Sequence, residues 1–413
     1  MERFIMHSDI NHCFAQIHEM MYPQLKEIPM LVGGSEKKRN GIVLAKNLLA
    51  KNYGIKTAMT LRDALELCPH VLIIHPDYDA YKYYSEKVKD IYREYSDQVE
   101  SFGIDEAWVD LSHSTKLFGS AVSIAQKIQQ RVLDEIGITI SIGLSFNKIF
   151  AKLGSDLIKP SGFVVIKKSN YRDIVFPLPV SDLLNVGPAT TEKLNKIGIH
   201  TIGDLANSSL ERINQLLGKN GDMVWAFANG LDYSDVNHQG FSRPPKSVGN
   251  SITTVKDITN RNQLKIVFQV LVESVASRLK DHNLVGKVVR ISIRNSSLKS
   301  FSKQTTLVSS TNTSTTIIKA VLDLANDDRT FNEPIRSIGV VLSKLTSDNH
   351  ATQLNLFYDA NYYHKEKILD ETIDKIRNKY SFEIIQRANV LEDRVLTNFN
   401  PKGSHTIFPV GFF

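Results

Sequence analysis

Three acidic residues, at two places in the chain, have the chemistry and the spacing that a metal-assisted reaction needs. Asp105 and Glu106 are adjacent and lie between two apolar stretches that have the pattern of β-strands. Adjacent like charges in an apolar setting are unfavourable unless a cation lies against them. Asp9 ends another apolar stretch, which begins at Phe4. Together the three could bind a divalent cation, whereas the alternative for the pair alone is a solvated hairpin turn.

The elements that must position these acids follow the order strand, helix, hairpin, helix, strand. This order predicts a split βαβ unit with a mostly antiparallel sheet, in which Asp9 ends the first strand close to the hairpin. A smaller unit, residues 28–75, is inserted after the first helix. The predicted strands are 4–9, 99–102, 107–111, 139–143 and 162–166, and the later helices are 80–95, 120–136 and 147–157.

Two more regions follow, separated by a linker. Residues 181–232 are predicted to be compact and helical, and a glycine-led helix N-terminus such as that at Gly187 suits phosphate binding. Residues 233–246 are polar and contain proline, which is typical of a linker. The second region has a βαββαβ pattern and is followed by an amphipathic helix, 365–380. Its strands are 248–255, 287–294, 301–308 and 335–345, and its helices are 261–282 and 314–326.

The net charge of the 413-residue chain is +6, and it is unevenly distributed. Residues 243–344 contain 16 Lys and Arg against 7 Asp and Glu, so this region carries +9 and the remainder −3. Arg290 and Arg294 alternate with apolar residues, which predicts a strand with one buried face and one cationic face. Such a face suits contacts to phosphates, and Lys246 adds to it. The alternative is a solvated basic surface.

Composition excludes several classes of protein. The chain has no apolar run of 18 residues, so no transmembrane helix is expected. Asp9 interrupts the apolar N-terminus where a signal peptide would continue. Cys13 and Cys68 are too few for a disulfide framework or a zinc site. These features fit a protein of the reducing cytosol.

The motifs in combination resemble those of the Y-family DNA polymerases of the polymerase IV type, in order over residues 4–380. The segments that carry the resemblance are 9–17, 47–59, 101–110 and 141–162. The fold that the resemblance implies is α+β, a right-hand polymerase with a split βαβ palm, small fingers, a helix-hairpin-helix thumb and a separate βαββαβ little finger. The implied domains are the palm (1–10 and 75–169), fingers (11–74), thumb (170–232), linker (233–245), little finger (246–346) and a C-terminal tail (347–413).

The resemblance implies a two-metal active site. Two Mg²⁺ ions would assist nucleotidyl transfer from a dNTP to a primer 3′-OH. Asp9 and Asp105 would bridge both ions, Glu106 would hold the ion that activates the 3′-OH, and the carbonyl of Ile10 would be a further ligand. Asp110 is expected to be structural.

Other positions match residues that bind the substrates. Phe14 matches the steric gate that excludes a ribose 2′-OH, although it could also be a core aromatic. Lys51 and Lys159 match positions that contact the incoming triphosphate. The DNA-binding residues would be Gly187, Lys246, Arg290 and Arg294. The sequence departs from the family pattern at Leu48, Asn11, Gly103 and Asn185, and Lys51 stands where arginine is common.

Residues Gln353, Leu354, Asn355, Leu356 and Phe357 resemble the peptide that binds the bacterial sliding clamp. Such peptides insert Leu and Phe side chains into an apolar pocket. The alternative is an edge strand or helix start that packs on its own domain.

The function implied is low-fidelity, template-directed DNA synthesis past lesions, without proofreading, by a cytoplasmic, nucleoid-associated monomer. Its partners would be primer-template DNA, a dNTP and the sliding clamp, with no membrane. One alternative is a catalytically weak, polymerase-like protein that binds DNA and the clamp. Another is a nucleotide cyclase, although the segment 102–107 does not match the glycine-rich turn of that class.

Overall fold

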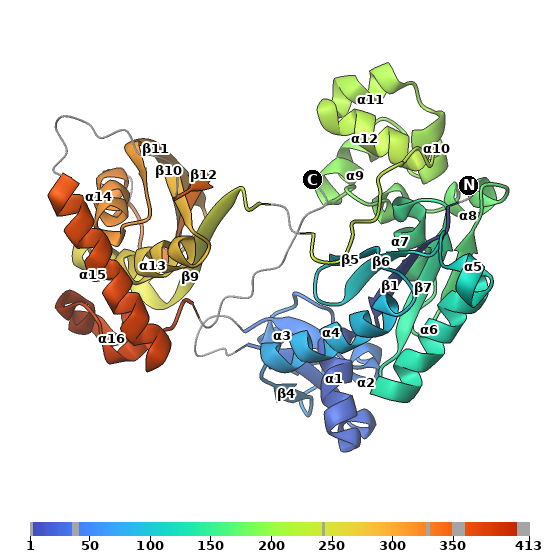
Figure 1. Cartoon of the computed structure of the whole chain (residues 1–413), viewed down its shortest axis with the longest axis horizontal. Coiled ribbons are helices and arrows are strands. Elements are labelled where there is room, and N and C mark those ends of the chain that lie inside the picture. The colour runs from blue at the N-terminus through green and yellow to red at the C-terminus, as the bar shows by residue number, and fades with distance from the viewer. Residues whose placement is uncertain (1–2, 35–40, 242–243, 328–330, 349–359, 403–413) are drawn as a thin grey trace. The chain divides into compact units, whose positions relative to one another are not determined.

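The computed structural model describes residues 3–34, 41–241, 244–327, 331–348 and 360–402, which form two compact units (Figure 1). Of the described residues, unit 1 contains 3–34 and 42–241, and unit 2 contains Gly41 and those from 244 to 402. No helix in these ranges is long and apolar enough to cross a membrane.

The largest sheet of unit 1 has five strands in the order β5-β6-β1-β7-β8. Strand β1 pairs antiparallel with β6 on one side and β7 on the other, and β7 pairs parallel with β8. This arrangement confirms the predicted split βαβ pattern. The strands are β1 (Ile5–Ile10), β5 (Val99–Phe102), β6 (Glu106–Asp110), β7 (Ile140–Ser145) and β8 (Phe163–Ile166).

Helices cover both faces of this sheet. Helices α1 (Cys13–Met21), α4 (Tyr78–Arg93) and α6 (Ala121–Ile136) share a core with one face, and α5 (Thr115–Phe118) precedes α6. Helix α7 (Lys148–Leu157) packs on β1, β7 and β8 from the other side. Because successive strand residues point to opposite faces, Met6 enters the core with α4 and α6, whereas Ile5 packs with Ala151 of α7.

Two smaller parts complete unit 1. The inserted segment forms a three-stranded sheet of order β3-β2-β4 with two short helices. Its elements are η1 (Pro23–Glu27), β2 (Met30–Gly33), β3 (Val43–Lys46), α2 (Leu48–Asn52), α3 (Leu61–Leu67) and β4 (Leu72–Ile74). The helical part shares a core with α7 and contains α8 (Tyr171–Val175), η3 (Val180–Asp182), α9 (Pro188–Asn195), α10 (Ile202–Asn207), α11 (Leu210–Leu217) and α12 (Lys219–Ala228).

Much of the predicted linker is attached to unit 1. Val236 is buried with Trp108, and the amide of Asn237 donates to Glu100 Oε2 at 2.9 Å. Lys148 Nζ lies 2.7 Å from the same carboxylate. The amide of Gln239 donates to the carbonyl of Asp97 at 3.0 Å. The segment from 233 to 239 is therefore a strap on the sheet, although it has no regular secondary structure.

Unit 2 contains an antiparallel sheet of order β11-β10-β12-β9 with two helices that pack in its core. The predicted βαββαβ order is confirmed. The elements are β9 (Ser247–Ile258), α13 (Arg261–Asp281), β10 (Leu284–Asn295), β11 (Ser300–Thr311), α14 (Ser314–Ala325) and β12 (Ile335–Ser347).

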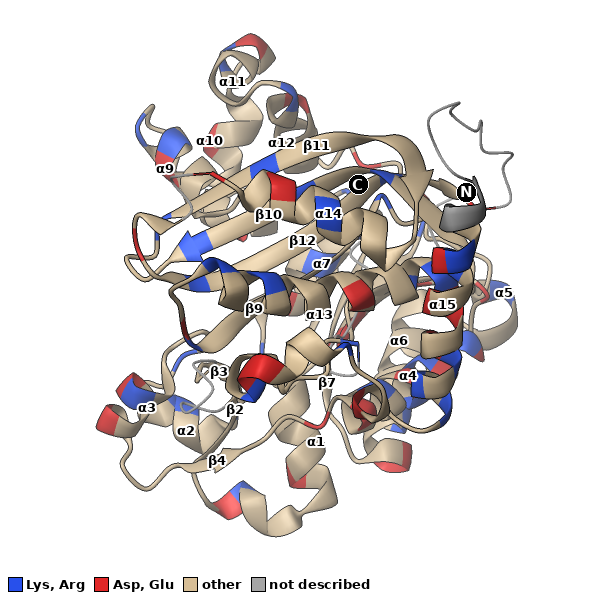
Figure 2. Cartoon of the chain, turned by 90° about the vertical axis from the view of Figure 1, so that its left-hand side faces the viewer, with Lys and Arg blue, Asp and Glu red and all other residues tan. Residues whose placement is uncertain are grey.

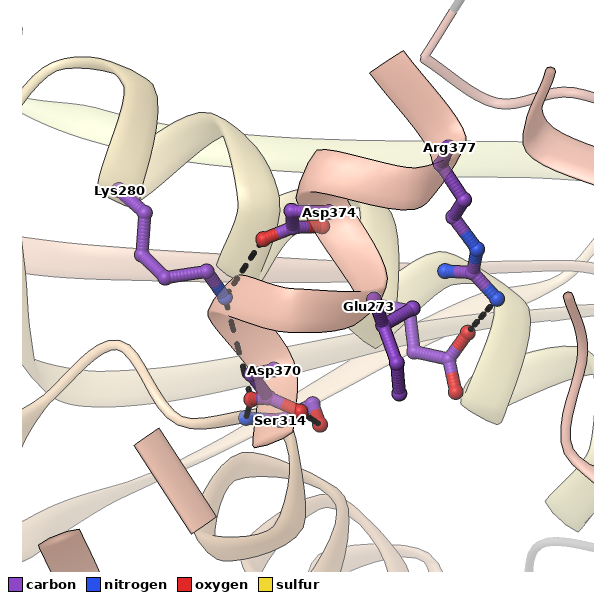
Figure 3. Close-up of a pocket in the computed structure, with 7 residues that line it drawn as sticks. Glu273, Lys280, Ser314, Asp370, Asp374 and Arg377 are labelled. Carbon is purple, nitrogen blue, oxygen red and sulfur yellow. Dashed lines mark hydrogen bonds and ion pairs between the residues drawn. The ribbon is translucent and has the colours of Figure 1, made fainter. Parts of the chain in front are cut away.

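A C-terminal helical segment docks on α13 of unit 2. It consists of α15 (Ala360–Lys379), η5 (Phe382–Ile384), η6 (Ala388–Asp393) and α16 (Arg394–Thr397). Figure 3 shows Arg377 of α15 directed at Glu273 of α13, and Lys280 of α13 directed at Asp374 and Asp370 of α15. Asp370 also accepts two hydrogen bonds from Ser314, at 2.6 and 2.7 Å. Ion pairs thus join α15 to α13, and hydrogen bonds join α15 to the start of α14.

Candidate active site

Strand pairing gathers the acidic residues on the face of the sheet that α7 covers. Asp9 of β1 is opposite Glu106 of β6, and His7 is opposite Trp108. Because residues two apart along a strand share a face, all four side chains lie on the α7 side. The predicted position of Asp9 beside the hairpin is confirmed by this register.

Asp105 lies in the turn that precedes β6, and its carbonyl accepts a hydrogen bond from the amide of Ile10 at 2.9 Å. Gly103 in the same turn has φ +84°. This conformation is unfavourable for other residues, and a Cβ here would also lie 3.4 Å from Asp105 Oδ1. Glycine is therefore suited to a turn that brings Asp105 against the end of β1.

The pKa of Asp9 is raised to about 6, first by burial and then by the neighbouring carboxylates Glu106 and Asp105, against the lowering effect of Lys159. The pKa of Asp105 is also raised, first by burial and then by Glu106. Negative charge at these positions is therefore poorly compensated, and a nearby cation would stabilise it.

Two lysines supply positive charge at these carboxylates. Lys159 Nζ lies 2.9 Å from Asp9 Oδ2, and Lys152 of α7 donates a hydrogen bond to Glu106 Oε2. Asp156 lies between the lysines, with one oxygen 2.7 Å from Lys159 Nζ and the other 3.7 Å from Lys152 Nζ. Within the described ranges, no three His, Cys, Asp or Glu residues are gathered in a group that could hold a metal ion.

The donor set nevertheless has the chemistry that a hard divalent cation prefers. The oxygen donors come from adjacent strands, and the ammonium groups occupy positions where positive charge is favourable. A divalent ion at Asp9, Asp105 and Glu106 would require the two lysines to move, with Asp156 available as a partner for both. The metal-ligand assignment, including that of Ile10, remains a prediction.

Phe14 lies on α1, one turn beyond the end of β1, and is half-buried. Its ring stacks on Tyr81 of α4, with centroids 4.2 Å apart and an angle of 7° between the planes. Tyr78 packs on it edge-on at 5.9 Å. The ring is therefore fixed in orientation by an aromatic cluster, as either a gate or a core residue would be.

The two predicted triphosphate lysines lie in different parts of unit 1. Lys159 is beside Asp9, as described above. Lys51 is exposed on α2, whose first turn is capped by the side chain of Asn47. Leu48 on the same helix has 46% of its surface exposed. The leucine side chain can supply no hydrogen bond to a phosphate, and the triphosphate role of Lys51 on this helix stays a prediction.

The structure gives physical reasons for the other departures. Asn11 is buried, where it accepts a hydrogen bond from Ser141 and donates one to Thr139. Asn185 has φ +71°, a conformation that asparagine tolerates better than most residues in place of glycine. Asp110 accepts a hydrogen bond from the amide of Ser112 at 2.8 Å, as expected of a structural residue.

The predicted DNA-binding residues are distributed over both units. Gly187 is the N-cap of α9. In unit 2, Arg290 and Arg294 are exposed on β10 while Val289, Ile291 and Ile293 between and beside them are buried, so the predicted alternation is confirmed. Lys246 is exposed just before β9. Figure 2 shows Lys and Arg along the strands and helices of this unit. The predicted clamp peptide, 353–357, lies outside the described residues.

Sequence reasoning missed three residues that contact the acidic site, namely His7, Lys152 and Asp156. Two of them carried a signal, because Lys148, Lys152 and Asp156 are four residues apart on the predicted helix 147–157 and share one face. His7 carried none, since a single histidine in an apolar strand is an ordinary core residue.

Models of protein families match most of the chain. Residues 8–156 match the impB/mucB/samB family, and residues 245–356 match the C-terminal domain of that family. Residues 181–232 match the thumb domain of DNA polymerase iota.

Curated proteins are similar over nearly the full length. The chain is 40% identical over 396 residues to DNA polymerase IV of Acetivibrio thermocellus, covering 96% of this chain and 99% of that protein. It is 34% identical to DNA polymerase IV 2 of Bacillus subtilis, covering 94% of each.

A solved structure of a Y-family DNA polymerase chimera superposes with a TM-score of 0.74 at 21% identity, covering 83% of this chain and 99% of that one. DinB from Sulfolobus solfataricus superposes with a TM-score of 0.54 at 22% identity, covering 82% and 98%. These structures share the fold.

Proposed function

Because the chain belongs to the impB/mucB/samB family, and so to the Y-family DNA polymerases, we propose that the carboxylates on the α7 face are the centre at which it extends a primer. The chain is a DNA-directed DNA polymerase of the translesion type, a metal-dependent nucleotidyltransferase. The observation that supports this location most directly is the pairing of Asp9 with Glu106 across β1 and β6. In addition, the carbonyl of Asp105 accepts a hydrogen bond from Ile10 at the end of β1.

We propose Mg²⁺, two ions per site, as the metal, with Asp9, Asp105, Glu106 and the carbonyl of Ile10 as the ligands. Bound Mg²⁺ would lower the pKa of the primer 3′-OH and neutralise the charge that develops on the leaving pyrophosphate. Asp9 and Asp105 would supply oxygens to both ions, and Glu106 would supply oxygens to the ion at the 3′-OH. Lys159, once released from Asp9, and Lys51 bind triphosphate oxygens.

Primer extension tests this proposal. The wild-type chain should add the templated nucleotide to a primer-template duplex with Mg²⁺, and EDTA should abolish the addition. DNA binding without extension would instead indicate a polymerase-like binding protein, and a cyclic product from triphosphate alone would indicate a cyclase. No 3′-to-5′ degradation of a mismatched primer is expected.

Phe14 is proposed to exclude ribonucleotides, because it lies one turn into the chain beyond Asp9 and Ile10 and its ring is fixed by stacking on Tyr81. The Phe14→Ala enzyme should discriminate between dNTP and rNTP about 10- to 100-fold less well, since the excluded volume is that of one hydroxyl group. The measurement is kcat/KM for each nucleotide. Phe118→Ala, which changes an exposed ring on α5, is the control. Unchanged discrimination in Phe14→Ala would make Phe14 a core residue.

DNA binding is proposed for the N-terminus of α9 at Gly187, and for Lys246, Arg290 and Arg294 of unit 2. The exposed face of β10 presents its arginines in a row, with Gln304 of β11 as a hydrogen-bond partner of Arg290 at 2.9 Å. Such surfaces contact the phosphates rather than the bases. The affinity should therefore fall steeply as salt is raised.

The peptide 353–357 is proposed to bind the bacterial sliding clamp through Leu356 and Phe357. A Leu356→Ala, Phe357→Ala double variant should lose clamp-stimulated processivity and keep its basal rate of extension, because hydrophobic anchors provide most of the binding energy of such peptides. Asn355→Ala, directly before Leu356, is the matched control. If the double variant is still stimulated by the clamp, the peptide is not the binding element.

A further inference from the structure

His7 is a fully buried residue that the mechanism above does not use. It has no exposed surface, and its ring packs edge-on against Trp108 with centroids 5.1 Å apart. Its two ring nitrogens face two different groups. Nδ1 lies 2.8 Å from Ser155 Oγ, and Nε2 lies 3.2 Å from Glu106 Oε2.

We propose that His7 is a positioning residue that fixes the Glu106 carboxylate through an Nε2–H donor and is itself oriented by Ser155 of α7. This inference rests on the proposed role of Glu106. The Nε2–Oε2 contact has hydrogen-bond length but poor alignment, so Nε2 has no hydrogen-bond partner among the described residues. A buried donor without a partner is costly, and a small rotation of Glu106 would satisfy it.

The environment favours one tautomer of the ring. If the proton were on Nδ1, the lone pair of Nε2 would face a carboxylate oxygen at 3.2 Å, which is repulsive. With the proton on Nε2, the ring donates to Glu106 and Nδ1 accepts from the Ser155 hydroxyl. The Ser155 hydroxyl has a single proton, so in this tautomer it donates to Nδ1 in place of the carbonyl of Lys152, its acceptor at 2.7 Å in the structure.

The contacts also determine which carboxylate oxygen is used. Both His7 and Lys152 approach Oε2 of Glu106, and neither approach uses Oε1. If Lys152 leaves when a cation binds, a small rotation of Glu106 would let His7 Nε2–H bond to Oε2, which leaves Oε1 for the cation. A group that orients a metal ligand in this way commonly changes metal affinity or activity by 10- to 100-fold.

The test is a double-mutant cycle between His7→Phe and Glu106→Gln. Phenylalanine keeps an aromatic ring against Trp108 but removes the donor. His7→Phe should lower kcat about 10- to 100-fold at little change in KM for primer-template, and should weaken Mn²⁺ binding, followed by electron paramagnetic resonance, by a similar factor. His7→Gln, which retains a donor, should recover part of both losses.

In the Glu106→Gln background, His7→Phe should lower kcat by less than about threefold, because the effect of His7 on kcat acts through the Glu106 carboxylate. The control is His18→Phe, another buried histidine, whose partner is the Tyr81 hydroxyl at 2.8 Å. Its effect should be the same in both backgrounds. If His7→Phe does not fold, Ser155→Ala enters the same cycle.

Two outcomes separate the inference from the proposed function. Wild-type activity in Glu106→Gln would overturn the role of Glu106 itself. If Glu106→Gln lowers kcat strongly, and His7→Phe lowers kcat by the same factor in the wild-type and Glu106→Gln backgrounds, the role of Glu106 is supported and the role of His7 is overturned.

Discussion

The Asp105→Asn enzyme is expected to extend primers about 10³-fold more slowly than the wild type. Asp105 is proposed to contribute oxygens to both metal positions, so its loss removes about 4 kcal/mol of transition-state stabilisation, which corresponds to that factor. Asparagine keeps the shape of the side chain and leaves the backbone hydrogen bond from the Ile10 amide to the carbonyl of residue 105 intact. The change should therefore appear in kcat from single-turnover kinetics, while affinity for primer-template DNA remains within about twofold.

The matched control is Asp110→Asn, the same substitution at the other end of β6. Asp110 is buried, but its carboxylate accepts a hydrogen bond from Ser112, and asparagine retains an acceptor for that bond. The control should keep more than about a tenth of the wild-type rate. Equal losses in the two variants would show that any acid on this strand is needed for folding, and would remove the reason to place Asp105 at the metal.

The sequence predicted the part of the site that depends on the order of the elements. The split βαβ order placed Asp9, at the end of the first strand, beside the hairpin that carries Asp105 and Glu106. The alternation of Arg290 and Arg294 with apolar residues predicted the exposed basic face of β10. Local patterns were sufficient in both cases because the elements are long and regular.

The backbone conformations of the residues that depart from the family pattern could not be predicted in this way. Gly103 and Asn185 have positive φ angles that only the folded turn reveals. The contacts of His7 could not be foreseen either, because they depend on α7 lying over β1, and Ser155 is 148 residues away in the chain. The strap over residues 233–239 has linker composition, but Val236 is buried by tertiary packing. Composition predicts that a segment has irregular structure, but not whether the segment packs on the domain beside it.

The docking of α15 is also a tertiary effect, and it leads to a large expected change in stability. Glu273 of α13 is buried and lies 2.9 Å from both Arg377 and Arg387 of the C-terminal segment. Arg377 itself is only 9% exposed. Removing one partner of a buried ion pair leaves an unpaired charge and typically costs about 3–5 kcal/mol.

The Glu273→Ala chain should therefore lose about 3–5 kcal/mol from the unfolding free energy of unit 2, while unit 1 is unaffected. The chain has two tryptophans, Trp108 and Trp225, and both are in unit 1. Urea unfolding followed by tryptophan fluorescence thus reports unit 1, whereas circular dichroism reports both units. A two-unit chain need not unfold in one step, so the two probes can be compared directly.

We expect Glu273→Ala to lower the urea midpoint of unit 2, which is the part of the circular dichroism transition without a matching change in fluorescence. The fluorescence midpoint, which reports unit 1, should not change. Glu383→Ala, at an exposed position in η5, should change neither probe by more than about 0.5 kcal/mol. If Glu273→Ala resembles Glu383→Ala, the C-terminal segment does not depend on this pair. If instead the fluorescence midpoint moves with the circular dichroism, the stability of unit 1 depends on unit 2, and the two units do not unfold independently.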